Sequence, residues 1–253
     1  MMLFLKNQWR YCLTAIMFFT RIPVSLADFK ESDLNKATRY FPLVGLLVGG
    51  VGALIFWLAH HLLPLDLALL LSMVATILLT GAFHEDGLAD SMDGLGGGFG
   101  REQVLTIMTD SRIGSYGAIS IILILLIKFQ ALSHQAVLTI PIILVAGHAL
   151  SRFCAVLVMY AQSYVKAEGK SKPLATSISV AELMVAASFG LMPLTFFAAH
   201  QLLALLPVLL VWLWFSAKIK VRIGGYTGDC LGAMQQLTEV AFYIGLLATA
   251  SFT

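Results

Sequence analysis

The residue types best suited to chemistry lie in the stretch 81–101, GAFHEDGLADSMDGLGGGFGR, which follows a long apolar run. It carries four carboxylates within nine positions. Asp86, Asp90 and Asp93 are spaced i, i+4 and i+7, which places them on one stripe of a helix. Glu85 points about 100° away from that stripe, because each helical residue turns the chain by that angle.

Three like charges on one helical stripe repel, and no lysine or arginine lies between Arg39 and Arg101 to relieve them. A divalent cation would supply that relief, since hard carboxylate oxygens suit Mg²⁺, with Mn²⁺ as an alternative. The sequence therefore predicts a metal site on Asp86, Asp90 and Asp93, with Glu85 as a weaker ligand. The alternative is an acidic helix end that is simply exposed to water.

Glycines and arginines follow the carboxylates and favour a phosphate ligand. Gly96, Gly97 and Gly98 leave the backbone open to close approach by an anion, and Arg101 comes directly after them. The same glycines would also suit an ordinary helix stop and loop, since their spacing is not that of a P-loop. Downstream, Asp110 is a further candidate metal ligand, and Arg112 is suited to bidentate phosphate contact.

Three further groups of residues are candidates for the same site. His148 and Arg152 are four residues apart, so they share one side of a predicted span, where a charge is either functional or snorkels to the headgroups. Thr227 and Asp229, in the glycine-rich loop 224–233, would bind a nucleotide or ribose, or belong to a tight turn. His84 would relay a proton or be structural.

Composition defines the environment that positions these side chains. The chain is 59% hydrophobic and only 12% charged, and its mean hydropathy is +0.88. These values are typical of a polytopic membrane protein. The net charge of +2 and the lack of a dense basic patch speak against nucleic-acid binding.

The hydropathy pattern predicts one integral domain over residues 1–253: an all-α bundle of about seven transmembrane helices. Residues 1–40 form its N-terminal segment, in which the run 12–19 is too short to span and is predicted to lie at the interface. The predicted spans are 42–62, 65–85, 113–132, 137–160, 178–199, 202–217 and 235–252, with the acidic helix continuing out of the second.

Basic residues alternate between the connections of these spans. Nearly all lysines and arginines fall before the first span or in alternate connections, with Lys128 as the exception. The positive-inside rule therefore places the N-terminus and the acidic stretch in the cytoplasm. Of the fourteen acids only Asp66 falls on the other side, so the centres of the spans are expected to be nearly free of acids.

At this point a family resemblance emerges. HEDGLADSMDGLGGG, IMTDSRIGSYG and GGYTGDCLGA, with FFTRIP and RYFPLVG ahead of them, resemble the cobalamin synthase family of adenosylcobinamide-GDP ribazoletransferases. The resemblance extends from Phe18 to Glu239 and has no departure at the carboxylates. It implies a magnesium-dependent step that assembles the nucleotide loop of adenosylcobalamin at the bacterial inner membrane.

The implied substrates are adenosylcobinamide-GDP and α-ribazole or its 5′-phosphate, and GMP is released. Phosphoryl transfer needs positioning and charge neutralisation. Asp86 and Asp90 are then metal ligands, Asp93 a ligand or general base, and Arg101 and Arg112 contacts to phosphate, with Arg152 as a further candidate. Besides the lipid bilayer, a second copy or another cobalamin-pathway enzyme is left open as a partner.

Two rival functions share some of these features. A CDP-alcohol phosphotransferase or an aspartate-motif prenyltransferase also holds spaced aspartates and Mg²⁺ at helix ends, but the CDP-alcohol pattern needs Ala-Arg where this chain has Ala89-Asp90. A cation or proton transporter would need carboxylates along a path through the membrane, which the predicted spans lack.

Overall fold

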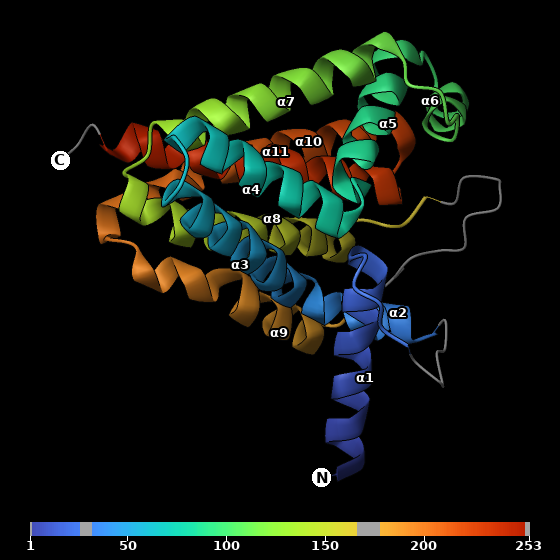
Figure 1. Cartoon of the computed structure of the whole chain (residues 1–253). Coiled ribbons are helices and arrows are strands. Elements are labelled where there is room, and N and C mark those ends of the chain that lie inside the picture. Colours follow the sequence, from blue (N-terminus) through green and yellow to red (C-terminus); the bar gives the residue numbers. More distant parts are fainter. Residues whose placement is uncertain (1, 26–31, 166–177, 251–253) are drawn as a thin grey trace.

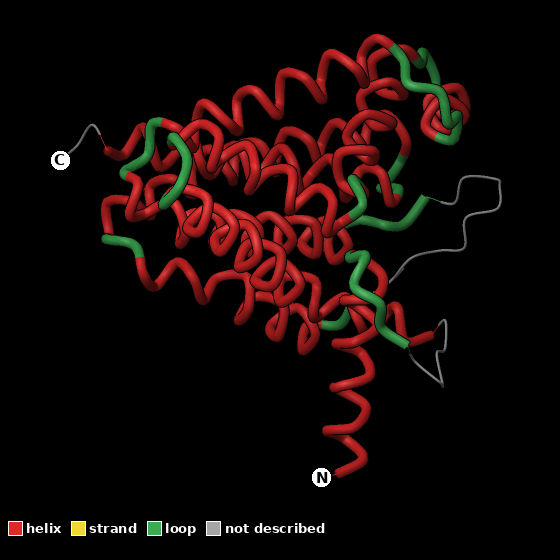
Figure 2. The backbone as a smooth tube through the Cα atoms, viewed as in Figure 1, coloured by secondary structure: helices red, strands yellow, loops and turns green. Residues whose placement is uncertain are grey.

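The computed structural model describes residues 2–25, 32–165 and 178–250. Within these ranges the chain consists of helices and loops without a β-strand, apart from one isolated bridge between Tyr164 and Tyr226 (Figure 2). The predicted all-α class is therefore confirmed. Four basic residues used to predict the topology lie outside the described residues: Lys30, Lys166, Lys170 and Lys172.

The elements follow one another in a simple order. They are α1 (Met2–Phe19), α2 (Ser32–Ala37), η1 (Thr38–Tyr40), α3 (Phe41–His60), α4 (Leu65–Thr80), α5 (Phe83–Gly97), α6 (Arg101–Met108), α7 (Ser115–Ser133), η2 (Val137–Thr139), α8 (Ile140–Ala161), α9 (Val180–Leu191), η3 (Met192–Phe196), η4 (Ala199–Ala204), α10 (Leu205–Ile223) and α11 (Gly228–Ala250).

Fewer helices than predicted have the length and apolar character of a span. In the described part there are four, Asp33–His60, Ser115–Ser133, Val137–Ala161 and Ala199–Ile223, or five if the bent pair of α4 and α5 counts as one. This supports a polytopic membrane protein but not the predicted count of seven. The predicted span 178–199 is broken, since α9 has 12 residues and η3 follows it.

The predicted span 235–252 belongs to α11, which is not among the span candidates. α11 contacts α5, α7, α8 and α10, and most of its residues are buried. A helix that is surrounded by protein does not need a uniformly apolar surface, which explains how it accommodates Gln235, Gln236 and Glu239.

The connections between helices are divided between the two ends of the bundle as the distribution of basic residues predicted. The connections after α3, α7 and α9 and the end of α11 lie together at one end (left in Figure 1), whereas α1, α2, α5 and α6 lie at the other. The connections without lysine or arginine thus share one end. α1 projects from the bundle and is not a span candidate, and its placement at the membrane interface stays a prediction.

The acidic helix does not continue out of the second span as predicted. Gly81 and Ala82 both have left-handed backbone conformations, with φ of 65° and 58°, and α5 leaves α4 at an angle of 85°. This conformation costs a non-glycine residue such as Ala82 about 1–2 kcal/mol. The break turns α5 away from the direction of α4, so its carboxylates lie across the end of the bundle.

Candidate active site

Three carboxylates from two helices are electrostatic neighbours where α5 packs against the start of α11. Asp86 is exposed, and Asp90 and Asp229 are half-buried. The helices approach closely because glycines face each other: a Cβ on Gly87 would lie 2.9 Å from the Asp229 backbone oxygen and 3.3 Å from Gly232 Cα. Residues 139 positions apart therefore form one acidic cluster, defined here as Asp86, Asp90 and Asp229.

The electrostatics of this cluster follow from its geometry. Burial, together with the neighbouring carboxylates of Asp229, Asp86 and Asp93, raises the pKa of Asp90 to about 7. Burial also raises the pKa of Asp229, and the charge of Asp86 adds to the effect. Such mutual repulsion favours binding of a cation. Among the described residues, however, no three His, Cys, Asp or Glu side chains are close enough to form a metal site by themselves.

Asp93, the third member of the predicted stripe, has a different set of contacts. Its Oδ2 accepts a hydrogen bond from the Gly114 backbone N–H at 2.7 Å, and its Oδ1 accepts one from Gly117 at 2.8 Å. Asp93 therefore satisfies two free N–H groups at the first turn of α7. This contact leaves its role as metal ligand or general base a prediction, and gives it a structural role that the sequence pattern did not indicate.

Glu85 lies off the stripe, as its angular position predicts. It is buried, and its Oε1 accepts a hydrogen bond from the Gln236 side chain at 2.9 Å. Its other oxygen has no partner. Glu85 thus contacts the buried side of α11 rather than Asp86 and Asp90.

The glycines after the carboxylates are used for packing. Gly96 and Gly97 belong to the last turn of α5, and Gly98 ends it. A Cβ on Gly96 would lie 2.7 Å from the Tyr116 ring, and one on Gly98 would lie 2.7 Å from Val104. These glycines let α6 and α7 approach α5, and none has a positive φ. A phosphate-binding role for them stays a prediction.

The predicted arginines, Arg101 and Arg112, follow the C-terminal end of α5 in the chain, and each already has a partner within the protein. Arg101 donates from Nε to the Ile223 carbonyl oxygen at 3.0 Å. Arg112 forms an exposed ion pair with Asp110 at 2.6 Å, which lowers the pKa of Asp110 to about 2. The charge of Asp110 is therefore paired with the Arg112 guanidinium. Arg222, which sequence reasoning missed, donates to the carbonyls of Leu95 and Gly98 at the end of α5.

The loop between α10 and α11 is a tight turn. Gly224 has a φ of 86° and ends α10, and the Thr227 hydroxyl accepts a hydrogen bond from the Cys230 N–H at 3.3 Å. Tyr226 is fully buried. The loop thus forms a turn, which also places Asp229 in the first turn of α11, and a nucleotide- or ribose-binding role for Thr227 and Asp229 stays a prediction.

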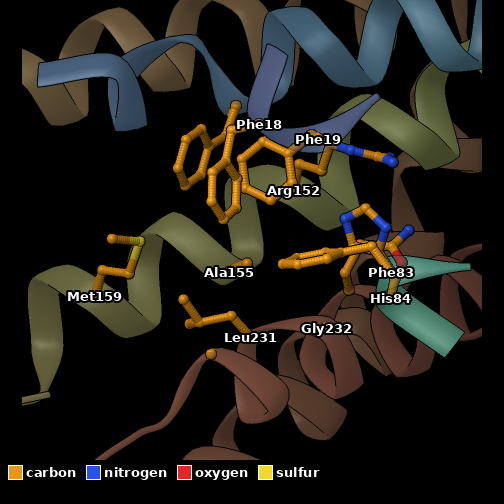
Figure 3. A pocket seen from close by; sticks show the side chains of 12 residues that line it. Phe18, Phe19, Phe83, His84, Arg152, Ala155, Met159, Leu231 and Gly232 are labelled. Carbon is orange, nitrogen blue, oxygen red and sulfur yellow. The ribbon is translucent and has the colours of Figure 1, made fainter. Parts of the chain in front are cut away.

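His84 and Arg152 line a cavity beside the acidic cluster. Figure 3 shows Phe18 and Phe19 on one side of it, and Met159, Ala155 and Leu231 on the other. As predicted, His148 and Arg152 lie on one side of α8: Arg152 Nη1 donates to the His148 carbonyl oxygen at 3.0 Å. Both side chains are buried, so Arg152 does not snorkel.

A buried ionic network in the bundle centre was missed by sequence reasoning. Glu239, which is 0% exposed, pairs with Lys128 of α7 and lies 3.2 Å from His148 Nδ1. Its carboxylate also accepts hydrogen bonds from Tyr243, at 3.1 Å, and from Gln235. Glu239 is therefore an exception to the expectation that the centres of the predicted spans are nearly free of acids. Because α11 begins at Gly228, Glu239 is the twelfth of its 23 residues.

Lys128 was the signal that could have revealed this network. A lysine within an apolar helix is expensive unless it is paired, so its position predicts an acid on a neighbouring helix.

The comparisons with known proteins agree over nearly the whole chain. The family model described as cobalamin-5-phosphate synthase matches residues 11–247. An adenosylcobinamide-GDP ribazoletransferase of Ralstonia pickettii (strain 12J) is 46% identical over 252 residues, which cover 98% of each chain. Another from Shewanella frigidimarina (strain NCIMB 400) is 47% identical over 249 residues, covering 96% of this chain and 95% of the relative. No solved structure matches.

Proposed function

The chain belongs to the cobalamin-5-phosphate synthase family, and from that premise we propose that it joins α-ribazole or its 5′-phosphate to adenosylcobinamide-GDP and releases GMP. The observation that carries this proposal is the acidic cluster of Asp86, Asp90 and Asp229, in a chain that is similar to ribazoletransferases over nearly its whole length. A pyrophosphate substrate brings negative charge to this cluster, so the reaction needs a cation there.

We propose Mg²⁺ for that role, with Mn²⁺ as a substitute. Mg²⁺ commonly takes one or two protein carboxylates and fills its remaining positions with water and substrate phosphate. Asp86 and Asp90, one helical turn apart, fit this requirement, and Asp229 would be the additional ligand from α11. When bound, the ion would neutralise the pyrophosphate and the departing GMP.

The transfer itself is a displacement at phosphorus. The ribazole hydroxyl oxygen forms a bond to the phosphorus that carries cobinamide, the P–O bond to GMP breaks, and GMP leaves with the bonding electron pair. The hydroxyl proton passes to a carboxylate. Asp93 stays the predicted general base, because Asp90 is proposed as a metal ligand. Arg101 and Arg112 stay the predicted phosphate contacts.

We propose that the site faces the cytoplasm of a bacterial inner membrane. Among the described residues, α2, the start of α6 and the end of α10, which carry Lys36, Arg101 and Arg222, lie at the end of the bundle that holds α5, and basic connections are retained in the cytoplasm. A cysteine placed at Phe99, which is 96% exposed, should react with a membrane-impermeant thiol reagent only from that side. Labelling of this cysteine in intact cells from the outside would show that the site faces the periplasm instead.

The activity is tested with purified full-length protein in liposomes. The protein is given Mg²⁺ and adenosylcobinamide-GDP with or without α-ribazole 5′-phosphate, and free GMP is measured. GMP should appear only with both substrates, EDTA should abolish it, and Mn²⁺ should restore it. Asp66→Asn, an exposed carboxylate at the start of α4, is the matched control and should keep full activity.

Other outcomes identify other functions. GMP formed equally well without the ribazole would indicate a pyrophosphohydrolase. CMP released from a CDP-alcohol donor would indicate a CDP-alcohol enzyme, and a transporter would release no nucleotide.

A further inference from the structure

Six of the seven arginines already donate to an acceptor within the protein. They bond carboxylate or carbonyl oxygens, and they are Arg10, Arg39, Arg101, Arg112, Arg152 and Arg222. The seventh is Arg21, whose guanidinium forms no hydrogen bond or ion pair with any residue that the structure describes. The residue is exposed, so this guanidinium is open to a ligand.

Arg21 is held at the bend between α4 and α5. Its backbone N–H donates to the Leu79 carbonyl oxygen at 2.7 Å. A Cβ on Gly81 would lie 2.3 Å from Arg21 Nε, so the side chain lies directly against the backbone of the bend. Because Gly81 also has a φ of 65°, two separate features of this position require glycine.

The segment before Arg21 is packed on the first turn of α5. Phe18 and Phe19 each meet the Phe83 ring edge to face, with centroid distances of 5.5 and 5.6 Å (Figure 3). Phe19 also stacks on the His84 imidazole at 5.8 Å. These contacts fix the place where the chain leaves α1, and a backbone that is already positioned loses less entropy when Arg21 binds a ligand.

The Arg21 guanidinium is not needed to complete the end of α4. A cation at a helix C-terminus commonly donates to the free carbonyls of the last turn. Here the carbonyl oxygens of Leu78 and Leu79 already accept hydrogen bonds from the backbone N–H groups of Gly81 and Arg21. The backbone therefore supplies the contacts that would otherwise explain a cation at this place.

The acidic cluster begins one helical turn beyond the bend. The Asp86 backbone N–H donates to the Ala82 carbonyl oxygen at 2.9 Å, and one turn of helix rises about 5.4 Å. Arg21 and Asp86 are thus both near the start of α5, yet in the described part of the chain they form no ion pair with each other. A phosphate at the cluster would find a guanidinium nearby that has no competing acceptor.

We propose that Arg21 binds the pyrophosphate of adenosylcobinamide-GDP, with its planar fork donating to two oxygens of one phosphate. The inference rests on the proposed function and adds a phosphate contact that sequence reasoning missed. Arg101 and Arg112, the contacts predicted from sequence, already donate to the Ile223 carbonyl oxygen and to Asp110. Arg21 can bind a phosphate without giving up a bond of this kind.

Two substitutions of Arg21 test this contact in the full-length protein. Arg21→Met removes the charge and the donors, and should raise the KM for adenosylcobinamide-GDP at least about tenfold, because charge-assisted hydrogen bonds are lost. Arg21→Lys keeps the charge without the planar fork and should have an intermediate effect. The KM for α-ribazole, which carries no phosphate, should change less than about twofold in both variants.

Thermal stability separates ligand binding from a structural role. Because the guanidinium has no acceptor among the described residues, Arg21→Met should change Tm by less than about 2 °C. Lys6→Met is the matched control, since it removes the same charge from the exposed surface of α1. It should change neither the two KM values nor Tm.

A chemical probe tests the contact without turnover. Phenylglyoxal modifies accessible guanidinium groups, and peptide mass spectrometry measures the rate of modification at Arg21. Adenosylcobinamide-GDP or inorganic pyrophosphate, each with Mg²⁺ and at about ten times its Kd, should slow this modification about tenfold, whereas α-ribazole should not. Such protection would support the contact even if the wild type forms no GMP, the result that would refute the proposed function.

Three results would overturn the inference. Unchanged KM values in Arg21→Met together with no protection by either pyrophosphate compound would show that Arg21 does not contact the substrate. Equal protection by phosphatidylglycerol vesicles alone would assign the guanidinium to a lipid headgroup. A marked fall in Tm of Arg21→Met with both KM values unchanged would assign it to the stability of the bend.

Discussion

Replacing Lys128 by methionine tests how the buried ionic network stabilises the bundle. Methionine keeps most of the side-chain volume and removes the charge. Lys128 is 3% exposed and pairs with Glu239, which is fully buried. The substitution therefore leaves a carboxylate inside the protein with no cation at that oxygen.

The size of the effect follows from that loss. Breaking a buried ion pair on one side costs about 3–5 kcal/mol, because the remaining charge stays desolvated. For a chain of this length, about 3–5 kcal/mol corresponds to a decrease in Tm of roughly 6–20 °C. The double variant Lys128→Met/Glu239→Gln removes both charges, and its loss should be smaller than the sum of the two single losses.

Thermal unfolding in one detergent, followed by tryptophan fluorescence, measures these differences. Lys220→Met, on the exposed surface of α10, is the matched control and should change Tm by less than about 2 °C. An unchanged Tm in Lys128→Met would refute the reasoning. Strictly additive losses in the double variant would show that the two charges do not act as a pair.

The remaining predictions concern the acidic cluster and its neighbours. Asp90→Asn should lower GMP formation at least about 100-fold while Tm is retained, because it removes a proposed ligand charge, whereas Glu85→Gln should be milder; equal losses would contradict the separation of the two faces of α5. Without metal, the contribution of Asp90 to stability should fall as pH rises from about 4 to about 7, since the folded protein holds its proton more tightly than the unfolded chain does. Mg²⁺ should therefore raise Tm more at pH 8 than at pH 5.5, and Asp90→Asn should remove that difference; an equal Mg²⁺ effect at both pH values would argue against Asp90 as a ligand. Asp93→Ala should cost about 1–3 kcal/mol, because two backbone N–H groups of α7 lose their acceptor, and Asp93→Asn should cost less; an unchanged Tm in the alanine variant would contradict that role.

Much of the site could be predicted from local sequence spacing. The i, i+4 separation of Asp86 and Asp90 holds in any α-helix, so their shared face did not depend on the rest of the fold. The same reasoning correctly placed Glu85 off that face and His148 beside Arg152. Hydropathy likewise determined the helical membrane class, because only helices satisfy the backbone of such apolar segments within one element.

Contacts between distant segments were decided only by the tertiary structure. Asp93 accepts a hydrogen bond from the start of α7. Asp229 lies beside α5 because Gly87 and Gly232 allow α5 and α11 to approach closely. Spacing along the chain carries no information about either approach. Hydropathy likewise does not distinguish a helix buried in protein from one that faces lipid, so it could not show that α11 is enclosed by other helices.

The pairing of Lys128 with Glu239 shows this division most clearly. Sequence alone placed a lysine within an apolar helix, and the cost of an isolated charge there requires a partner. It could not identify that partner, because α11 becomes a buried central helix only when α5, α7, α8 and α10 pack around it. Residue types and local spacing thus determined which groups lie on each helix, while the packing of helices determined which groups meet, because the energy of a buried charge depends on neighbours that are remote in the chain.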